Sequence, residues 1–382
     1  MLKMMMLLML SLPFGDADYE AHAVYDKTLE QISGDAIHNV VETHFDLETS
    51  FNFAATGDVL IHDHLYEDVE TESGYDFTSR VDEVAPYLQD KDLVFMNQET
   101  PIGGEELRLS GYPMFNAPLE AADLLEHLNA DIVSLANNHT LDRSTEGVER
   151  TTDILKEKGI EYVGANVSPE DRKRQRIIDV EGVSVGFLAY TYGTNGIPVP
   201  EGEDHLVNLI DMLTILSDME DLRDEVDMLV VSMHQGNEYE EFPRDEHVQQ
   251  FEQIADAGAD IILGHHPHVL QPVDIYERED GEETVIAYSL GNFFSAQQSL
   301  ETKLGGIIGF DITYSGGDED ISVDAVKFMP TYMHSNEFDD FELVPLTDAT
   351  EYGLNDADGV YQDVSDHMKY YTDEVEVVEY LE

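Results

Sequence analysis

Residues 259–268, with the sequence ADIILGHHPH, consist of an apolar run that ends in three histidines. A buried strand followed at once by metal-binding side chains is typical of an α/β sheet, whose ligands bind at the carboxyl ends of its strands. Three histidines within four positions at a strand end are seldom packing residues, and Pro267 stiffens the chain between two of them. The stretch therefore predicts an α/β fold with a metal site at the end of a strand.

Four other apolar runs end in the same way. In chain order they are FNFAATGD (51–58), ending at Asp58, LVFMNQE (93–99), ending in Asn97 and Glu99, DIVSLANNH (131–139), ending in Asn138 and His139, and MLVVSMH (228–234), ending at His234. Taken singly, each has a plain alternative, since an aspartate after a glycine is usually a turn residue and NNH is compatible with a turn and a surface histidine. Because all five runs share one context, we expect their polar ends to meet at one edge.

The side chains at these ends offer a mixed set of donors. They are the carboxylates of Asp58 and Glu99, the amide of Asn138, and the imidazoles of His234, His266 and His268. Such a nitrogen and oxygen set suits Mn, Fe or Zn, whereas Ca²⁺ prefers oxygen alone. One tetrahedral ion needs fewer donors than these. The sequence therefore predicts two divalent ions, a pair that can hold a phosphoryl group and lower the pKa of a water.

The charge of the chain is strongly negative. Its 382 residues include 82 Asp and Glu against 19 Lys and Arg, for a net charge of −63. Nucleic acid is excluded as a partner, because a polyanion is bound by clustered basic residues and the densest such cluster, RKRQR at 172–176, is typical of a solvated turn. So much charge opposes compaction unless salt screens it, which favours a halophilic source or an exported protein of a salty or alkaline habitat. The absence of cysteine excludes disulfides and thiolate metal sites.

The N-terminal residues 1–15, MLKMMMLLMLSLPFG, carry one lysine and then an apolar run. The run is shorter than the roughly 20 residues of a membrane-spanning helix and fits the apolar part of an export signal. The alternative is a buried first helix or an incorrectly assigned start. We expect a leader and helical lead-in over 1–48, a catalytic domain over 49–335 and an acidic C-terminal extension over 336–382. The location expected is exported or membrane-associated and facing outside, or else the cytoplasm of a halophile.

Five segments together resemble the CapA/PgsA family of bacterial capsule and poly-γ-glutamate biosynthesis proteins. They are TGDVLIHD (56–63), VFMNQETPIGG (94–104), LANNHTLDRSTEGVERTTDIL (135–155), the segment 234–276, which contains HQGNEYEE and GHHPHVLQPVDIY, and IAYSLGNFF (286–294). The resemblance covers about residues 51–333, and the order NNH, HxGxEY, GxHPHVLQ is specific. The family lies in the calcineurin-like metallophosphoesterase superfamily, which implies a layered β-sandwich flanked by helices.

The resemblance also implies roles for individual residues. Asp58 corresponds to the first metal-binding aspartate, Glu99 with Asn97 beside it to the bridging position, Asn138 to a metal ligand, His139 to the histidine that stabilises the phosphoryl transition state, His234 to a ligand of the second ion, and His266 and His268 to the paired histidines of the closing motif. The implied reaction is hydrolysis of a phosphoester by two divalent ions. The implied partners are a phosphoester or anionic polymer substrate and the subunits of a membrane polymer synthase.

The chain departs from the superfamily pattern at three places. The D-x-H start is absent, and we expect His62, with His64 as the alternative, to supply the missing nitrogen. Glutamate replaces aspartate at position 99, and Gln235 stands where tryptophan is more usual.

Three further residues have two interpretations each. His265 is a spectator or hydrogen-bonds a neighbouring ligand. Glu238 orients a histidine or substrate, or has no role in the site. Asn292 faces the same edge or belongs to an ordinary turn.

These departures leave more than one function open. The leading hypothesis is a phosphoesterase that acts in the assembly or export of an anionic surface polymer. The alternative is a non-catalytic accessory subunit of a membrane polymer synthase or exporter. A salt-adapted nucleotidase or cyclic-nucleotide phosphodiesterase is a third interpretation, because a fold does not determine its substrate.

Overall fold

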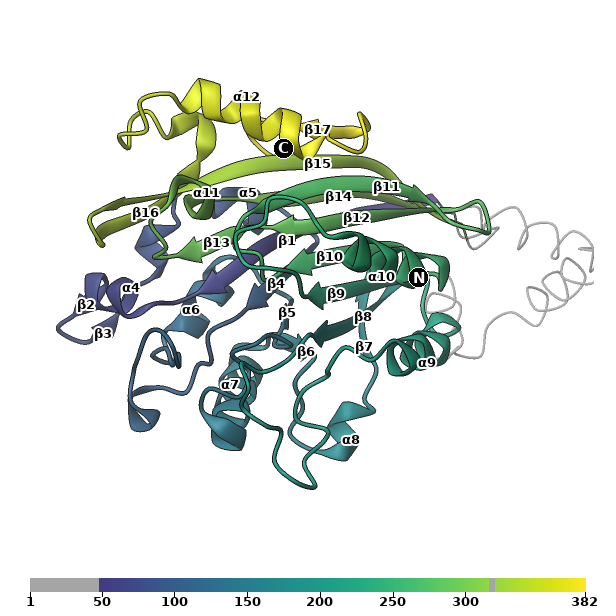
Figure 1. Cartoon of the computed structure of the whole chain (residues 1–382), viewed down its shortest axis with the longest axis horizontal. Coiled ribbons are helices and arrows are strands. Elements are labelled where there is room, and N and C mark those ends of the chain that lie inside the picture. Colours follow the sequence, from purple (N-terminus) through teal and green to yellow (C-terminus); the bar gives the residue numbers. More distant parts are fainter. Residues whose placement is uncertain (1–47, 316–319) are drawn as a thin grey trace, which may run out of the picture. The chain divides into compact units, whose positions relative to one another are not determined.

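The computed structural model describes residues 48–315 and 320–382, in which strands and helices largely alternate from β1 (Glu48–Leu60) to β10 (Ile261–His265) and strands predominate afterwards (Figure 1). β1 contains the predicted FNFAATGD run. The predicted leader, with its candidate export signal, lies outside the described residues apart from Glu48. Within the described ranges, every helix is too short or too polar to cross a lipid bilayer.

A first sheet has the strand order β16-β15-β14-β1-β4-β5-β6, with β13 beside β1 and β17 beside β15. Its other strands are β4 (Leu93–Gln98), β5 (Ile132–Ser134), β6 (Glu161–Val163), β13 (Asn292–Ser295), β14 (Leu304–Ser315), β15 (Asp320–Asn336), β16 (Asp339–Pro345) and β17 (Val375–Val377). β1, β4, β5 and β6 run parallel. Their carboxyl ends therefore lie at the same edge.

A second sheet has the order β11-β12-β10-β9-β8-β7. Its strands are β7 (Arg176–Val180), β8 (Val183–Thr191), β9 (Met228–His234), β10 (Ile261–His265), β11 (Leu270–Glu277) and β12 (Glu283–Leu290). β8, β9, β10 and β12 run parallel, and antiparallel β7 and β11 form the two edges. The β9 and β10 ends, which carry the predicted histidines, are thus neighbours.

The two sheets pack face to face through alternate residues of their strands. Phe53 and Phe95 of the first sheet share one buried apolar cluster with Phe187 of the second. The Phe95 and Phe187 rings stack with their centroids 5.9 Å apart. Because successive side chains of a strand point to opposite faces, the intervening residues of β1 and β4, such as Ala54 and Val94, lie in a different cluster. Alternate side chains of these strands thus fill the space between the two sheets, and the others pack on the opposite face of the sheet.

Helices cover the outer face of each sheet. α6 (Ala121–His127) and α7 (Ser144–Lys158) pack on the first sheet, and α9 (Met212–Arg223) and α10 (Asp245–Asp256) on the second. The predicted layered α/β architecture, a β-sandwich flanked by helices, is confirmed. The remaining elements are α4 (Asp63–Asp68), β2 (Glu70–Thr71), β3 (Gly74–Tyr75), η1 (Thr78–Arg80), α5 (Pro86–Gln89), η2 (Glu105–Leu107), α8 (Pro169–Arg172), α11 (Leu300–Lys303), η3 (Leu346–Asp348) and α12 (Ala357–Met368).

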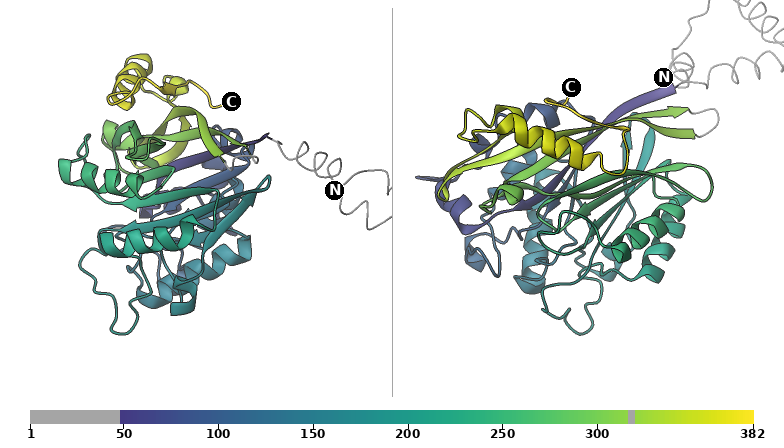
Figure 2. Two further views of the ribbon diagram at one scale, coloured as in Figure 1. Left: turned by 90° about the vertical axis from the view of Figure 1, so that its right-hand side faces the viewer. Right: turned by 45° about the horizontal axis from the view of Figure 1, so that its top comes forward.

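The residues after 335 continue the first sheet. β16 pairs with β15 to form a hairpin, and β17 pairs with β15 in parallel. α12, yellow in Figures 1 and 2, contacts both β17 and β11, and its Val364 and Met368 join the apolar cluster between the sheets. The expected boundary between a catalytic domain and an acidic extension therefore falls inside the β15–β16 hairpin. The residues after 335 include few apolar side chains, but these are spaced so that they can be buried while the acidic side chains stay outside.

Candidate metal centre

Strand register brings the predicted polar residues to one place. Asp58 lies opposite Asn97 on one side and Asn292 on the other. In the second sheet, His234 lies opposite His265. The two sheets meet here, because Asn97 Nδ2 lies 3.5 Å from His234 Nδ1.

Two glycines permit the close approach of the strands at this point. A Cβ at Gly57, just before Asp58, would lie 2.1 Å from the carbonyl oxygen of Gly291. A Cβ at Gly264, just before His265, would lie 1.9 Å from the carbonyl oxygen of Tyr288. Both distances are far shorter than any real contact, so only glycine fits. The backbone N–H of Asp58 consequently reaches the Gly291 carbonyl at 2.9 Å.

A first group of candidate ligands consists of Asp58, Glu99 and His234. Each offers a donor atom within 4.8 Å of the other two, and all three are buried. Asn138 joins them, because its Oδ1 lies 2.8 Å from His234 Nε2. Both carboxylate oxygens of Glu99 are buried without a hydrogen-bond partner among the residues that the structure describes. A buried carboxylate without a partner is costly, and a bound cation would remove that cost.

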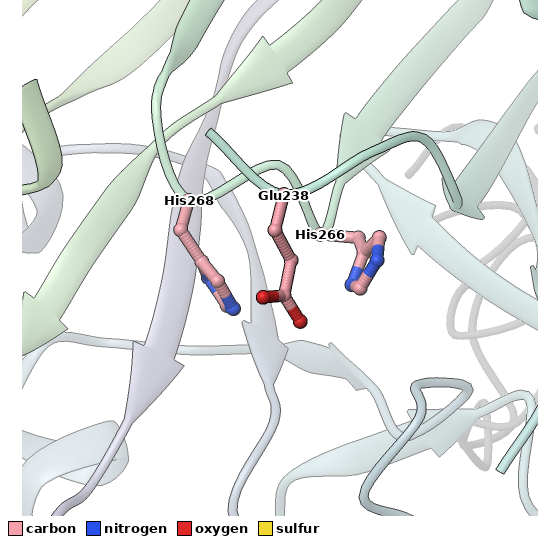
Figure 3. A group of neighbouring side chains, drawn as sticks. All are labelled: Glu238, His266 and His268. Carbon is pink, nitrogen blue, oxygen red and sulfur yellow. The ribbon is translucent and has the colours of Figure 1, made fainter. Parts of the chain in front are cut away.

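A second group consists of Glu238, His266 and His268, whose donor atoms also lie within 4.8 Å of one another. Figure 3 shows the Glu238 carboxylate between the two imidazoles. His268 links the groups, because its Nδ1 lies 3.0 Å from Asp58 Oδ2 and its Nε2 lies 3.9 Å from Glu99 Oε1. Asn292 Oδ1 lies 3.1 Å from the same Nδ1. With Nδ1–H donating to these oxygens, Nε2 is left to face the centre.

Burial and mutual proximity shift the carboxyl groups in opposite directions. Burial raises the pKa of Glu99 well above its usual range, and the nearby Asp58 adds to this although His268 opposes it. Burial also works to raise the pKa of Asp58, but His265 and His268 outweigh it and hold that pKa well below the usual range.

The imidazoles of the two groups also differ. Burial lowers the pKa of His266 to about 3, and the nearby His268 adds to this. Burial lowers the pKa of His234 well below its usual range. Burial opposes protonation of His268 too, but Glu99 and Asp58 raise its pKa to about 9. His234 and His266 are therefore neutral, which is the form in which an imidazole binds a divalent ion, whereas His268 has to release a proton before its Nε2 can bind one. The residues present therefore fit such ions.

His139 is held in one orientation beside the first group. Its Nδ1 lies 2.7 Å from Asp142 Oδ2, and its Nε2 lies 4.0 Å from Glu99 Oε1. The edge-on ring of Phe115 packs against it with centroids 4.6 Å apart. Asn195 Nδ2 lies 3.5 Å from His139 Nδ1, and Asn195 accepts a hydrogen bond from Asn138. This network directs the free Nε2 of His139 toward the candidate ligands.

The sequence did not single out Asp142 or Asn195. Asp142 could have been predicted from its spacing, because side chains three residues apart can meet across one turn of the chain, as Asp142 and His139 do. Asn195 follows β8 in a loop and had no such signal.

The structure does not bring His62 into either group. Its Nδ1 lies 2.9 Å from the Leu60 carbonyl oxygen and 3.4 Å from the backbone nitrogen of Ala296. Its ring packs edge-on against Phe115, with centroids 5.1 Å apart. Burial lowers the pKa of His62 to about 4. His62 thus lies outside both groups of candidate ligands.

The other secondary candidates lie around the ligands. Asn97 donates to Asp58 Oδ1 at 2.8 Å, which steadies that carboxylate. His265 Nδ1 lies 3.4 Å from the same oxygen, and its ring stacks on Phe95. Neither nitrogen of His265 has a hydrogen-bond partner with good geometry among the described residues. His265 therefore lies between Asp58 and the apolar core and belongs to neither group of candidate ligands.

Three exposed tyrosines surround the mouth of the centre. The Tyr192 ring packs on His266 and the Tyr239 ring on His268, with centroids 4.6 and 6.3 Å apart. Tyr112 packs on Phe115. A cavity of about 860 Å³ opens beside them, lined by residues that include His62, Tyr112 and Tyr239. Another cavity, of about 660 Å³, lies at the amino ends of β9 and β12, away from the candidate ligands, and on its wall Arg223 and Arg278 both pair with Asp260.

Comparisons with known proteins agree with the motifs. Residues 52–297 match the family model described as "Bacterial capsule synthesis protein PGA_cap". The chain is 32% identical over 268 residues to "Capsule biosynthesis protein CapA" of Bacillus anthracis, covering 68% of this chain and 63% of that protein. It therefore spans less than two thirds of that relative's length. It is 28% identical over 284 residues to "PGA biosynthesis protein CapA" of Bacillus subtilis, covering 72% and 71% of the two chains.

Solved structures show a more distant likeness. A 5′-nucleotidase precursor from Thermus thermophilus aligns with a TM-score of 0.47 at 17% identity, covering 82% of this chain and 59% of that one.

Proposed function

Because this chain belongs to the bacterial capsule synthesis protein family PGA_cap, we propose that it is a metal-dependent phosphoesterase in the biosynthesis or export of a capsule, poly-γ-glutamate or a similar anionic surface polymer. The observation that carries the proposal is the convergence of Asp58, Glu99 and His234, together with the two buried Glu99 oxygens that have no hydrogen-bond partner among the described residues. Structural side chains of this kind are normally hydrogen-bonded when buried.

Glu99 is central to the proposed arrangement. Its Oε1 lies 3.8 Å from His234 Nε2 and 3.9 Å from His268 Nε2, so it faces donors of both groups. Asp58, Asn138 and His266 complete the set that would hold two divalent ions. When bound, such ions neutralise the charge of a phosphoryl group and activate a water for attack on it. The protein side chains then have to position the substrate and move one proton.

His139 is the residue suited to the proton step. Asp142 holds its Nδ1, so Nε2 is the nitrogen available at the centre. From there it can donate a proton to the leaving oxygen of a phosphoester or stabilise the negative charge that develops. Tyr192 and Tyr239 at the mouth offer flat faces to the group that carries the phosphate.

The test combines metal content with hydrolysis. Purified protein is expected to contain Mn, Fe or Zn by mass spectrometry and to hydrolyse an aryl phosphodiester in Mn²⁺. His139→Ala is expected to keep its metal and lose about 10²- to 10⁴-fold in kcat, the usual worth of a positioned acid. His234→Ala is expected to lose both metal and activity. Metal-free parent protein, or a parent no more active than His139→Ala, would contradict the proposal.

A second function is favoured by the altered first motif. Val59 and Leu60 follow Asp58, and His62 lies outside both groups. A centre that lacks one donor is compatible with a non-catalytic accessory subunit of a membrane polymer synthase or exporter. Polymer production in cells separates the two functions: if deletion of the gene abolishes polymer and the His139→Ala variant restores it, catalysis is dispensable.

A further inference from the structure

The loop after β9 is tied to the loop after β10 on both sides of Glu238. The backbone N–H of Gln235 donates to the His265 carbonyl at 3.1 Å, and that of Tyr239 donates to the Pro267 carbonyl at 2.8 Å. Gln271 Nε2 adds a bond to the Glu240 carbonyl at 2.7 Å. Glu238 therefore has little freedom to move away from the histidine loop.

The backbone of both loops is held in an uncommon conformation. His266, His268 and Tyr239 have positive φ values of 97°, 60° and 67°. Such conformations cost about 1–3 kcal/mol each for residues other than glycine and persist where the surroundings hold them in place. Here they turn the His266 and His268 rings inward, to either side of the Glu238 carboxylate (Figure 3).

Distance and chemistry match a cation between these three side chains. Their donor atoms lie within 4.8 Å of one another. Ligands of a single Zn-like ion lie about 2.0–2.2 Å from it, hence within ~4.4 Å of each other, so small rotations bring the three together. His266 is buried, and its Nδ1 has no hydrogen-bond partner among the described residues. A carboxylate with two imidazoles is a common binding set for such ions.

We propose that Glu238 is a metal ligand and supplies, with His266 and His268, the donor that the first motif lacks. The inference deepens the proposed function and rests on the same metal centre. It replaces His62, whose Nδ1 is directed to the Leu60 carbonyl, as the compensating residue. Unlike Asp58 and Glu99, Glu238 is exposed, so this ion lies on the solvent side of the centre, where a substrate phosphate arrives.

Metal binding tests the assignment without any assay of activity. Parent, Glu238→Gln and His62→Ala proteins are stripped with a chelator and titrated with Mn²⁺, with bound ions counted per chain. The parent is expected to bind two ions. Glu238→Gln is expected to bind one as the parent does and the other at least about tenfold more weakly, whereas His62→Ala binds both as the parent does. Electron paramagnetic resonance is expected to lose the coupled two-Mn²⁺ signal in Glu238→Gln.

A matched control is Glu246→Gln, which removes the same charge from an exposed position at the start of α10. It is expected to bind two ions with parental affinity. Equal melting temperatures in chelator show that Glu238→Gln folds normally. Should that variant bind both ions as tightly as the parent, or should His62→Ala be the one that weakens, the assignment of Glu238 is wrong.

The outcomes also separate this assignment from the proposed function. A parent that binds two ions, loses one through Glu238→Gln and hydrolyses no phosphoester supports the ligand and overturns the phosphoesterase. A parent that hydrolyses phosphodiesters while Glu238→Gln binds both ions normally supports the phosphoesterase and overturns the assignment of Glu238 as a ligand. A parent that binds no Mn²⁺ overturns both.

Discussion

The two sheets contribute different chemistry to the centre. The first sheet supplies oxygen donors, from Asp58, Glu99 and Asn138, at and after the ends of β1, β4 and β5. The second sheet supplies nitrogen donors from His234, His266 and His268, at and after the ends of β9 and β10, and the Glu238 carboxylate after β9. The centre exists because the strand ends of both sheets meet, and contacts such as that of His268 with Asp58 cross between them.

The largest expected effect comes from separating the two sheets. Gly57→Ala places a Cβ against the Gly291 carbonyl, which lies only 2.1 Å from the ideal position. Overpacking against backbone is expected to lower the free energy of unfolding by about 3 kcal/mol and to displace Asp58. Urea unfolding measures the first effect and metal titration the second.

Gly193→Ala is the control for that substitution, since a Cβ there meets no atom of the described ranges within 4 Å. It is expected to change stability by less than about 0.5 kcal/mol. Equal stability of the two variants would mean that the sheets can move apart at β1.

A smaller effect on the free energy of unfolding is expected at Glu99, and its sign is expected to differ between metal-free and metal-bound protein. Its buried oxygens have no partner among the described residues, so in metal-free protein Glu99→Gln is expected to raise the free energy of unfolding by about 1–2 kcal/mol. With metal at 100 times its Kd, binding is expected to raise the free energy of unfolding of the parent by about 2.7 kcal/mol, and the variant is expected to lack this gain. Thermal unfolding with and without Mn²⁺ checks the reversal. Destabilisation in both conditions would show that Glu99 is needed for packing instead.

The smallest effect is expected at Asp171. This aspartate lies away from the centre, and its carboxylate is hydrogen-bonded by other groups of the protein. It accepts from the Val167 N–H at 3.0 Å, the Tyr162 hydroxyl at 2.9 Å and Arg176 Nη2 at 3.0 Å. Burial works to raise the pKa of Asp171, but these partners outweigh it and lower that pKa. The native state therefore binds fewer protons than the unfolded state, so the stabilisation is present above the ordinary value of 3.8 and is lost as pH falls through the lowered pKa.

Asp171→Asn is accordingly expected to lower the free energy of unfolding by about 1 kcal/mol at neutral pH, with the difference shrinking in acid. Urea unfolding across pH measures it. Metal binding is expected to stay parental, in contrast to Glu99→Gln. A difference that grows toward low pH would have the wrong sign for a carboxylate stabilised by these partners.

Much of the fold was readable because its signals are local. Each apolar run became a strand, and each polar end lies at the carboxyl end of that strand, since a strand has to leave the core where its apolar residues stop. The turn at Glu181 and Gly182, both with positive φ, joins antiparallel β7 and β8, and a glycine between two short apolar runs is a local signal of such a hairpin. The order of these local signals was enough to predict the layered α/β class.

Other features depended on contacts between distant segments. The residues after 335 were expected to form an acidic extension, yet Phe341 and Leu343 are buried once β16 pairs with β15. His62 was expected in the centre because it lies close to Asp58 in the sequence, but the chain turns into α4 there and its ring packs on Phe115. Glu238 had an uncertain role until the bond from Tyr239 to Pro267 placed it between two histidines.

The amino-acid sequence alone determined which residues can bind a cation and that they follow buried strands, because residue chemistry and apolar periodicity are properties of short segments. Only the tertiary structure decided which donors share a space, because that depends on strand register, on the approach that Gly57 and Gly264 allow and on backbone bonds between loops. These are distances between atoms far apart in the chain, and no local pattern encodes them.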